Sequence, residues 1–297
     1  MNLNKLKHHI SRINRSPKCI LCDKESFDTL PYYYYFGDRR IDIVQCVSCG
    51  LNTLYPMLST EEVRSLYSPE YFDKDYHCGF FEGRYVNEIE NLRREIRPIL
   101  SKIRTLQPGG RYLELGCAGG AMLAEARDQG YDTLGVELSS EMAAWGRSHL
   151  KLDIRSGTLT EQQFPPESFN VVFLGDVIEH LLHPKEELSE IRRLLKPNGI
   201  VALAYPMELN HIVPRVRQLL SIDKESPNKP YHLFYYSNCT IRQLLERCGF
   251  EVELQHEDKI VRTQPLATWV VDSLNHVVTT VSGRLGDRGF TIGRKSK

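Results

Sequence analysis

The chain passes from strand to helix at Tyr112-Leu113-Glu114-Leu115-Gly116-Cys117-Ala118-Gly119-Gly120, and a helical pattern follows from Ala121 to Asp128. A turn of such small residues lets the backbone approach a ligand closely and directs helix N–H groups toward it. About twenty residues beyond this turn, a second strand, Thr133 to Val136, leads to Glu137, whose carboxylate can accept hydrogen bonds from a ribose diol. We therefore expect an adenosine-containing cofactor.

An acidic residue just before the first glycine distinguishes this turn from a dinucleotide-binding turn. The dinucleotide fingerprint is G-x-G-x-x-G, whereas the pattern here is Glu114-x-Gly116-x-Ala118-x-Gly120. A carboxylate at Glu114 would repel a pyrophosphate, but it would attract a sulfonium or an α-ammonium group. The alternative is a tight strand-to-helix turn with a purely structural role.

At this point the chain resembles the class I S-adenosylmethionine-dependent methyltransferases, whose first motif reads E/D-x-G-x-G-x-G. Ala118 replaces the middle glycine, and its methyl group can be accommodated if the backbone φ angle there is negative. The family usually contacts the adenine near the residue that is Thr158 here, often through an acid, which Glu161 could supply. The resemblance implies S-adenosylmethionine as cofactor, bound by Glu114, Gly116, Cys117, Ala118, Gly120, Glu137, Leu138, Thr158, Leu159, Asp176 and Val177.

Strands and helices alternate from Arg111 onward, which predicts a parallel sheet with helices on both faces. In the resembling family, two further strands form an antiparallel pair at one edge. We therefore predict an α/β fold with a doubly wound, seven-stranded, mostly parallel sheet of the Rossmann-like methyltransferase type, in which ligands bind at the carboxyl ends of the strands. Helices are expected over 85–103 and 266–282, and the strands over 111–115, 133–137, 152–155, 169–174, 199–204, 251–256 and 289–294.

Three later stretches extend the resemblance. Asp176-Val177-Ile178-Glu179-His180-Leu181 matches the family motif D-V-[IL]-E-H-[LI]. Leu194 to Gly199 matches the L-K-P-G-G turn, with Asn198 in place of one glycine, and Tyr231 to Ser237 matches a late H-L…F-S stretch. The resemblance covers roughly residues 17–256.

Methyl transfer from a sulfonium is an in-line displacement, in which the enzyme mainly supplies proximity and alignment. A general base is needed if the acceptor is a hydroxyl or a carbon acid. We predict that this base is His180, because it lies one turn beyond Asp176 and an imidazole titrates in the right range. A buried structural histidine is the alternative. His232 could also line the acceptor site, but it is expected to be structural, because it belongs to a fold-defining stretch of the resembling family.

Four cysteines near the N-terminus form two C-x-x-C pairs, which can place four thiolates tetrahedrally around one Zn²⁺. Because cysteines would fill all four coordination positions of the zinc, the metal would be structural. The alternatives to a zinc site are redox-active cysteine pairs or free thiols. Between the pairs, Tyr32 to Tyr35 form either an aromatic strand packed on its neighbour or a lid over the substrate. The predicted ligands are Cys19, Cys22, Cys46 and Cys49.

These motifs suggest four regions. We expect a basic segment over 1–16, a zinc-binding module over 17–56, a helical lead-in or lid over 57–108 and the cofactor-binding methyltransferase domain over 109–297. In the resembling family, a group of bacterial enzymes also carries a zinc-binding N-terminal module.

Charge and composition narrow the function further. Lysine plus arginine equals aspartate plus glutamate, 38 each, so we expect no nucleic-acid partner. The sequence contains no apolar run of about 18 residues and begins with a polar, basic stretch, so we expect no membrane anchor and a cytoplasmic protein. We predict an enzyme that methylates a small-molecule acceptor, a sugar or a natural-product-like metabolite, at oxygen, with carbon or nitrogen as alternatives. The competing hypotheses are an RNA or protein methyltransferase that recognises its substrate through the zinc module, and a binding protein without turnover.

Overall fold

The computed structural model describes residues 18–66, 89–210, 212–220, 222–226, 230–258, 273, 276–281 and 285–296. The predicted basic segment 1–16 lies outside these residues, as does most of the predicted helix 266–282. Residues 67–88, within the predicted lead-in, are also outside them.

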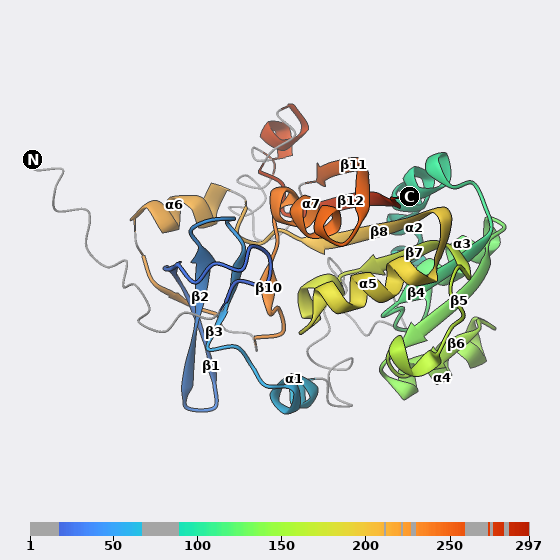
Figure 1. The fold of residues 1–297 in the computed structure, drawn as a ribbon, viewed down its shortest axis with the longest axis horizontal. Coiled ribbons are helices and arrows are strands. Elements are labelled where there is room, and N and C mark those ends of the chain that lie inside the picture. The colour runs from blue at the N-terminus through green and yellow to red at the C-terminus, as the bar shows by residue number, and fades with distance from the viewer. Residues whose placement is uncertain are drawn as a thin grey trace, which may run out of the picture.

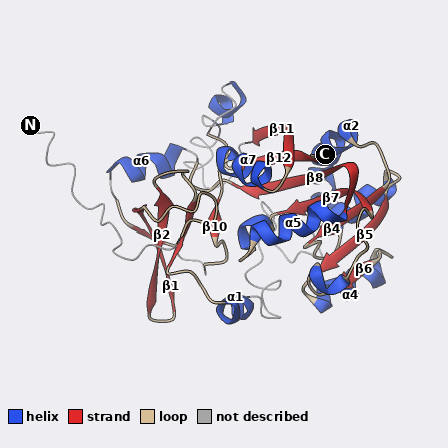
Figure 2. Ribbon diagram, viewed as in Figure 1, coloured by secondary structure: helices blue, strands red, loops and turns tan. Residues whose placement is uncertain are grey.

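A seven-stranded sheet forms the larger part of the described chain (Figures 1 and 2). Its order is β11-β12-β8-β7-β4-β5-β6, and β12 runs antiparallel to both β8 and β11, while the other neighbours pair in parallel. This confirms the predicted doubly wound, mostly parallel sheet with an antiparallel pair at one edge. The strands are β4 (Arg111–Leu115), β5 (Asp132–Glu137), β6 (Ile154–Ser156), β7 (Phe169–Gly175), β8 (Leu195–Pro206), β11 (Phe250–Asp258) and β12 (Arg288–Lys295).

Helices cover both faces of this sheet, because successive side chains of a strand point to opposite sides. Leu113 of β4 packs in the same core as residues of two helices, α5 (Pro184–Leu194) and α7 (Asn238–Arg247). Its neighbour Tyr112 packs in a second core, on the opposite face, with residues of α2 (Ile89–Leu106), α3 (Ala121–Asp128) and α4 (Ser140–His149). The apolar character of both faces thus explains the near-continuous hydrophobic strands.

The chain reverses its direction of winding at β4. From β4 it passes through α3 to β5 and β6, and it then returns to β7 on the other side of β4. The carboxyl ends of β4 and β7 therefore flank the crevice where ligands bind in open α/β sheets. The glycine-rich turn follows β4, and Asp176 follows β7, so both lie at this edge.

A second, smaller sheet lies beside the first one (Figure 1) and has the order β10-β3-β2-β1-β9. Three of its strands, consecutive in the N-terminal part of the chain, form an antiparallel meander: β1 (Phe27–Phe36), β2 (Arg39–Cys46) and β3 (Asn52–Tyr55). The helix α1 (Thr60–Leu66) follows them. The edge strands β9 (Lys224–Glu225) and β10 (Phe234–Tyr235) come from the segment between β8 and α7, which also contains α6 (Ile212–Leu220). Sequence analysis did not predict these two edge strands.

The small sheet shares a hydrophobic core with the large one. Leu21, Ile43 and Leu54 belong to the same buried cluster as Leu113 and Phe234. The packing is therefore continuous across the predicted boundary at residues 56–57, and the boundary itself stays a prediction. Within the described residues, no helix is both long and apolar enough to cross a membrane.

The four consecutive tyrosines lie on β1, and their side chains alternate between its two faces. The hydroxyl of Tyr34 lies 2.5 Å from the hydroxyl of Tyr235, and that of Tyr32 donates to the carbonyl of Pro214 at 3.1 Å. Tyr35, in contrast, is 49% exposed. Two of the four therefore pack against the C-terminal half of the chain, and the predicted lid role stays a prediction.

Candidate functional site

The turn after β4 depends on left-handed backbone at its glycines. Gly116 has a φ of 68° and Gly120 has a φ of 86°. A Cβ atom at Gly116 would lie 2.5 Å from Cγ2 of Val177, so only glycine permits the segment after β7 to pack on the turn. Ala118 also has a positive φ, 47°. The condition of a negative φ at this residue is therefore not met, and left-handed backbone costs a residue with a Cβ about 1–2 kcal/mol.

Glu137 explains how Ala118 is held in this conformation. The Oε2 atom of Glu137 accepts a hydrogen bond from the N–H of Ala118, and Oε1 accepts one from the N–H of Ser139, both at 2.7 Å. Burial raises the pKa of Glu137, while these N–H groups oppose that shift. Because each carboxylate oxygen has a second lone pair, Glu137 can still accept a bond from a ribose hydroxyl.

Glu114 is a buried acid at the same edge of the sheet. Its side chain is 6% exposed, and its Oε2 atom has no hydrogen-bond partner among the described residues. Burial raises the pKa of Glu114 well above its usual value, and the nearby Glu137 carboxylate raises it further. A buried carboxylate with an unsatisfied oxygen is costly unless a positive charge or a donor approaches it. The buried carboxyl group of Glu114 therefore fits a ligand that carries a positive charge.

The remaining predicted cofactor residues surround this pair. Cys117 and Leu159 are buried, whereas Leu138, directly after Glu137, is 58% exposed. Glu137 on β5 is paired in the sheet with Ser156, the last residue of β6. The turn that contains Thr158 follows Ser156 directly, so it begins beside Glu137. The turn is stabilised by Glu161, whose Oε2 atom accepts a bond from the N–H of Thr158 at 2.7 Å.

Asp176 has a partner that sequence analysis missed. Both of its carboxylate oxygens lie within 2.9 Å of Nη2 of Arg288, on β12. Asp176 has a φ of 53°, and its own N–H donates to the carbonyl of Ala204 at 2.9 Å. Because Arg288 is distant in sequence and lies in no motif, no sequence signal indicated this ion pair.

His180 lies on a short 3₁₀ helix, η5 (Ile178–His180), immediately after the end of β7. Its Nδ1 atom is 2.9 Å from the carbonyl of Tyr231, so Nδ1 carries the hydrogen and Nε2 carries the lone pair. Burial and the neighbouring His232 lower the pKa of His180 to about 3. The imidazole of His180 is therefore neutral near pH 7.

His232 contacts His180 directly, with ring centroids 4.8 Å apart. Its Nδ1 atom lies 3.3 Å from a carboxylate oxygen of Glu208. Burial alone would lower the pKa of His232, but the carboxylates of Glu208, Glu179 and Asp176 raise it to about 9. The sequence favours a structural role for His232 over a place in the acceptor site, whereas the contact with His180 places it beside the predicted base.

The four cysteines of the N-terminal pairs come together. The Sγ atoms of Cys19 and Cys49 lie 3.6 Å apart, and those of Cys22 and Cys46 lie 3.5 Å apart. Four sulfurs at the usual Zn–S distance of about 2.3 Å from one zinc ion would be separated by about 3.8 Å. The spacing therefore fits a tetrahedral metal site.

Two similar turns shape this cluster. The N–H of Asp23 donates to the carbonyl of Cys19 at 2.9 Å, and the N–H of Gly50 donates to the carbonyl of Cys46 at the same distance. Gly50 has a φ of 78°, as expected for a knuckle turn, and Asp23 adopts a φ of 64° at the equivalent position.

Comparison with known proteins agrees with this geometry. A family model described as a methyltransferase domain matches residues 89–255, from α2 into β11. The chain belongs to this family.

Individual relatives match parts of this chain. It is 30% identical over 146 residues to a protein of Mycolicibacterium smegmatis named "Probable S-adenosylmethionine-dependent methyltransferase", covering 49% of this chain and 53% of that protein. It is 28% identical over 117 residues to a ubiquinone biosynthesis O-methyltransferase of Photobacterium profundum, covering 36% and 50%. The chain thus spans about half the length of these relatives.

Solved structures share the methyltransferase fold. An S-adenosylmethionine-dependent methyltransferase from Archaeoglobus fulgidus has a TM-score of 0.51 at 18% identity, covering 71% of this chain and 99% of its own. A protein of Pyrococcus horikoshii has a TM-score of 0.50 at 19% identity, covering 81% and 100%. At such low identity, these structures show the fold alone.

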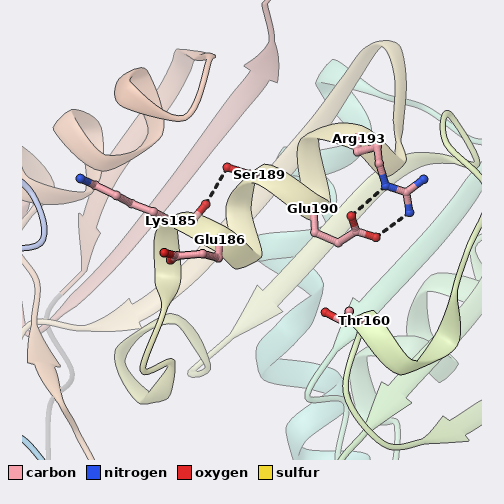
Figure 3. A pocket seen from close by; sticks show the side chains of 6 residues that line it. All are labelled: Thr160, Lys185, Glu186, Ser189, Glu190 and Arg193. Carbon is pink, nitrogen blue, oxygen red and sulfur yellow. Dashed lines mark hydrogen bonds and ion pairs between the residues drawn. The ribbon is translucent and has the colours of Figure 1, made fainter.

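A depression of about 550 Å³, lined by residues of α5 and by Thr160, is a separate feature (Figure 3). Two of its side chains, Glu190 and Arg193, form an ion pair at 2.6 Å, and the hydroxyl of Ser189 donates to the backbone carbonyl of Lys185 at 2.8 Å. None of the predicted cofactor residues lines it. We therefore do not assign it to the methyltransferase site.

Proposed function

We propose that the chain binds S-adenosylmethionine and transfers its methyl group to a small-molecule acceptor. The observation that carries the proposal is the buried, unsatisfied carboxylate of Glu114 beside the turn from Gly116 to Gly120. The cofactor would bring its positively charged amino-acid end to Glu114. Its ribose hydroxyls would donate to Glu137, and its adenine would pack near the exposed Leu138.

Bound in this way, the methyl group would face the carboxyl ends of β4 and β7. The acceptor would approach from the side of Asp176 and His180, and the catalytic effect would come mainly from in-line alignment. We propose a hydroxyl as the acceptor atom, because ubiquinone biosynthesis O-methyltransferases are among the relatives. The balanced charge, 38 basic and 38 acidic residues, favours a small acceptor over a nucleic acid.

His180 is the proposed proton acceptor in this reaction. Its imidazole is neutral and is oriented by the carbonyl of Tyr231, so that Nε2 has the free lone pair. The pKa of about 3 is below the range expected from the sequence and makes His180 a weaker base than an ordinary imidazole. We expect His180→Ala to lower turnover with little effect on the affinity for S-adenosylmethionine. Unchanged turnover would exclude His180 as the base.

We also propose that the four-cysteine cluster holds one structural zinc ion. With four protein ligands, the metal has no open position, so its role would be to stabilise the small sheet. The small sheet in turn fixes β10, and His232 is two residues before this strand.

Calorimetric titration of the purified, full-length protein with S-adenosylmethionine and S-adenosylhomocysteine tests the cofactor, with the zinc content measured on the same sample. We expect micromolar binding of both compounds and at least one zinc ion per chain, the one that the cysteine cluster holds. Glu114→Gln should weaken binding at least about tenfold, because a charge-assisted hydrogen bond contributes roughly 1.5–3 kcal/mol. Absence of binding to a folded, zinc-loaded sample would refute the proposal.

The acceptor is tested separately, by release of S-adenosylhomocysteine in the presence of hydroxylated aromatic compounds and sugars. Turnover with one of these classes would establish small-molecule methyl transfer. Turnover only with RNA or with a protein substrate would support the competing hypothesis, in which the zinc module recognises the substrate.

A further inference from the structure

Two histidines and a glutamate converge beside the predicted methyl-transfer site. Glu179 and His180 belong to η5, after β7, and His232 precedes β10. One metal-ligating atom from each of these residues lies within 4.8 Å of the others. We propose that Glu179, His180 and His232 bind one divalent transition-metal ion, at a site separate from the four-cysteine cluster.

The orientation of both imidazole rings supports this site. The Nε2 atom of His180 lies 3.7 Å from Oε1 of Glu179, and the Nε2 atom of His232 lies 4.0 Å from the same oxygen. Metal–ligand distances of about 2.0–2.2 Å would require the three atoms to approach each other to about 3–3.5 Å. Small side-chain rotations, with atomic movements of up to about one ångström, would meet this requirement.

The other ring nitrogens have the partners that metal-binding histidines normally have. The Nδ1 atom of His180 is 2.9 Å from the carbonyl of Tyr231, and the Nδ1 atom of His232 is 3.3 Å from the carboxylate of Glu208. A backbone carbonyl or a carboxylate at this position fixes the tautomer and makes Nε2 a better ligand. Both histidines therefore direct Nε2 toward Glu179, and a metal ion bound there would replace the proton on Nε2 of His232.

The burial of Glu179 without hydrogen-bond partners in the described part of the chain independently supports a metal site. Its side chain is 1% exposed, and neither carboxylate oxygen has a hydrogen-bond partner among the described residues. Its position is fixed, because its own carbonyl accepts a hydrogen bond from the N–H of Leu233 at 2.9 Å. A buried carboxylate without hydrogen bonds is costly, and coordination of a metal ion removes that cost.

The ligand set indicates the kind of metal. Two imidazoles and one carboxylate suit zinc, iron, cobalt, nickel or manganese, and three protein ligands leave coordination positions open. The site is close to the cofactor turn, because Val177, two residues before Glu179, packs on Gly116. A cation here could lower the pKa of an acceptor hydroxyl, in place of His180 as a base. This role rests on the proposed methyl transfer, whereas metal binding does not.

Metal stoichiometry tests the inference on the full-length protein. After equilibrium dialysis against Zn²⁺, we expect two zinc ions per chain in the unmodified protein and one in Glu179→Gln and in His232→Gln. Co²⁺ added to protein with zinc in the cysteine site should show d–d absorption without a thiolate charge-transfer band. Glu179→Gln should fold normally, because it preserves side-chain size at a carboxylate that makes no hydrogen bond within the described residues, and its melting temperature without added metal checks this.

Two further variants sharpen the test. Glu208→Gln should weaken the second metal about 10–100-fold, because it changes only the residue that orients His232. His256→Gln is the matched control: it removes a surface histidine that pairs with Asp258 on β11, and it should keep two zinc ions. One zinc ion in the unmodified protein, or a second one that persists in both Glu179→Gln and His232→Gln, would overturn the inference. Failure to bind S-adenosylmethionine with two zinc ions present would refute only the proposed function.

Discussion

The hydroxyl oxygens of Tyr34 and Tyr235 lie 2.5 Å apart, and both side chains are buried. Tyr34 is on β1 and Tyr235 is on β10, and these strands are not neighbours in the small sheet. The hydrogen bond therefore links the N-terminal module to the segment that precedes α7, over a distance in sequence that no local pattern could reveal.

Removal of either hydroxyl should destabilise the protein. We expect Tyr34→Phe and Tyr235→Phe each to lower the free energy of unfolding by about 1–3 kcal/mol, because the remaining hydroxyl loses its buried partner. The double variant should lose less than the sum, and urea denaturation measures all three. Tyr35→Phe is the control, since Tyr35 is 49% exposed, and it should change little. Additive losses from the two single variants would show that the hydroxyls do not interact.

Substitution of Ala118 by glycine should relieve backbone strain. With a φ of 47°, Ala118 has about 1–2 kcal/mol of strain, which exceeds the roughly 0.5–1 kcal/mol of extra backbone entropy that glycine loses on folding. We expect Ala118→Gly to leave stability unchanged or to raise it by up to about 1 kcal/mol. In contrast, Ala144→Gly, at an exposed position of α4, should lose about 1 kcal/mol. Equal losses in thermal unfolding of the two variants would argue against strain at Ala118.

Cofactor affinity should depend on pH through Glu114. Because burial and Glu137 raise its pKa, Glu114 retains a proton in the free protein at pH values where an ordinary carboxyl is ionised. A bound ammonium group favours the carboxylate, so binding should release a proton, and affinity should rise with pH until the raised pKa is passed.

Calorimetry in buffers of different ionisation enthalpy measures this proton release. Glu114→Gln should reduce the release to any contribution from Glu137. An affinity independent of pH below the raised pKa would mean that Glu114 does not face the cation.

Glu137 should contribute to both cofactor affinity and stability. Glu137→Gln should weaken S-adenosylmethionine binding about 10–100-fold, because the charge that accepts the ribose hydroxyls is lost. Glu137→Ala should in addition lower stability by about 2 kcal/mol, since the N–H groups of Ala118 and Ser139 lose their acceptor. Glu141→Gln, an exposed change in α4, should alter neither property. Unchanged affinity in Glu137→Gln would place the ribose elsewhere.

Metal removal should affect more than the cysteine cluster. Chelation, or Cys22→Ser, should empty the cysteine cluster of zinc and lower the melting temperature, because β3 and β1 hold the edge strands β10 and β9. Hydrogen exchange should then increase in 230–236 as well as in 18–55. Cys239→Ser, at an exposed cysteine of α7, should leave the zinc content and the melting temperature unchanged. If exchange increased only in 18–55, the two parts would be structurally independent.

Local sequence patterns were sufficient to predict the large sheet. The strand at 111–115 was predicted with the bounds of β4, and the helix at 121–128 with those of α3, because strong hydrophobic patterns and a glycine-rich turn delimit both. The antiparallel edge was predicted from the family resemblance. The cluster of four cysteines was predicted from spacing, since a pair of C-x-x-C turns creates most of its own geometry.

The sequence by itself determined the strands of the large sheet, where the glycine-rich turn lies and which cysteines can share a metal, because neighbouring residues decide each of these features. The tertiary structure alone decided that Arg288 pairs with Asp176 and that His232 lies beside Glu179. It also decided that the two-residue strands β9 and β10 complete the small sheet. Strands this short have no periodicity of their own, and pairing between distant segments depends on the packing of the whole core.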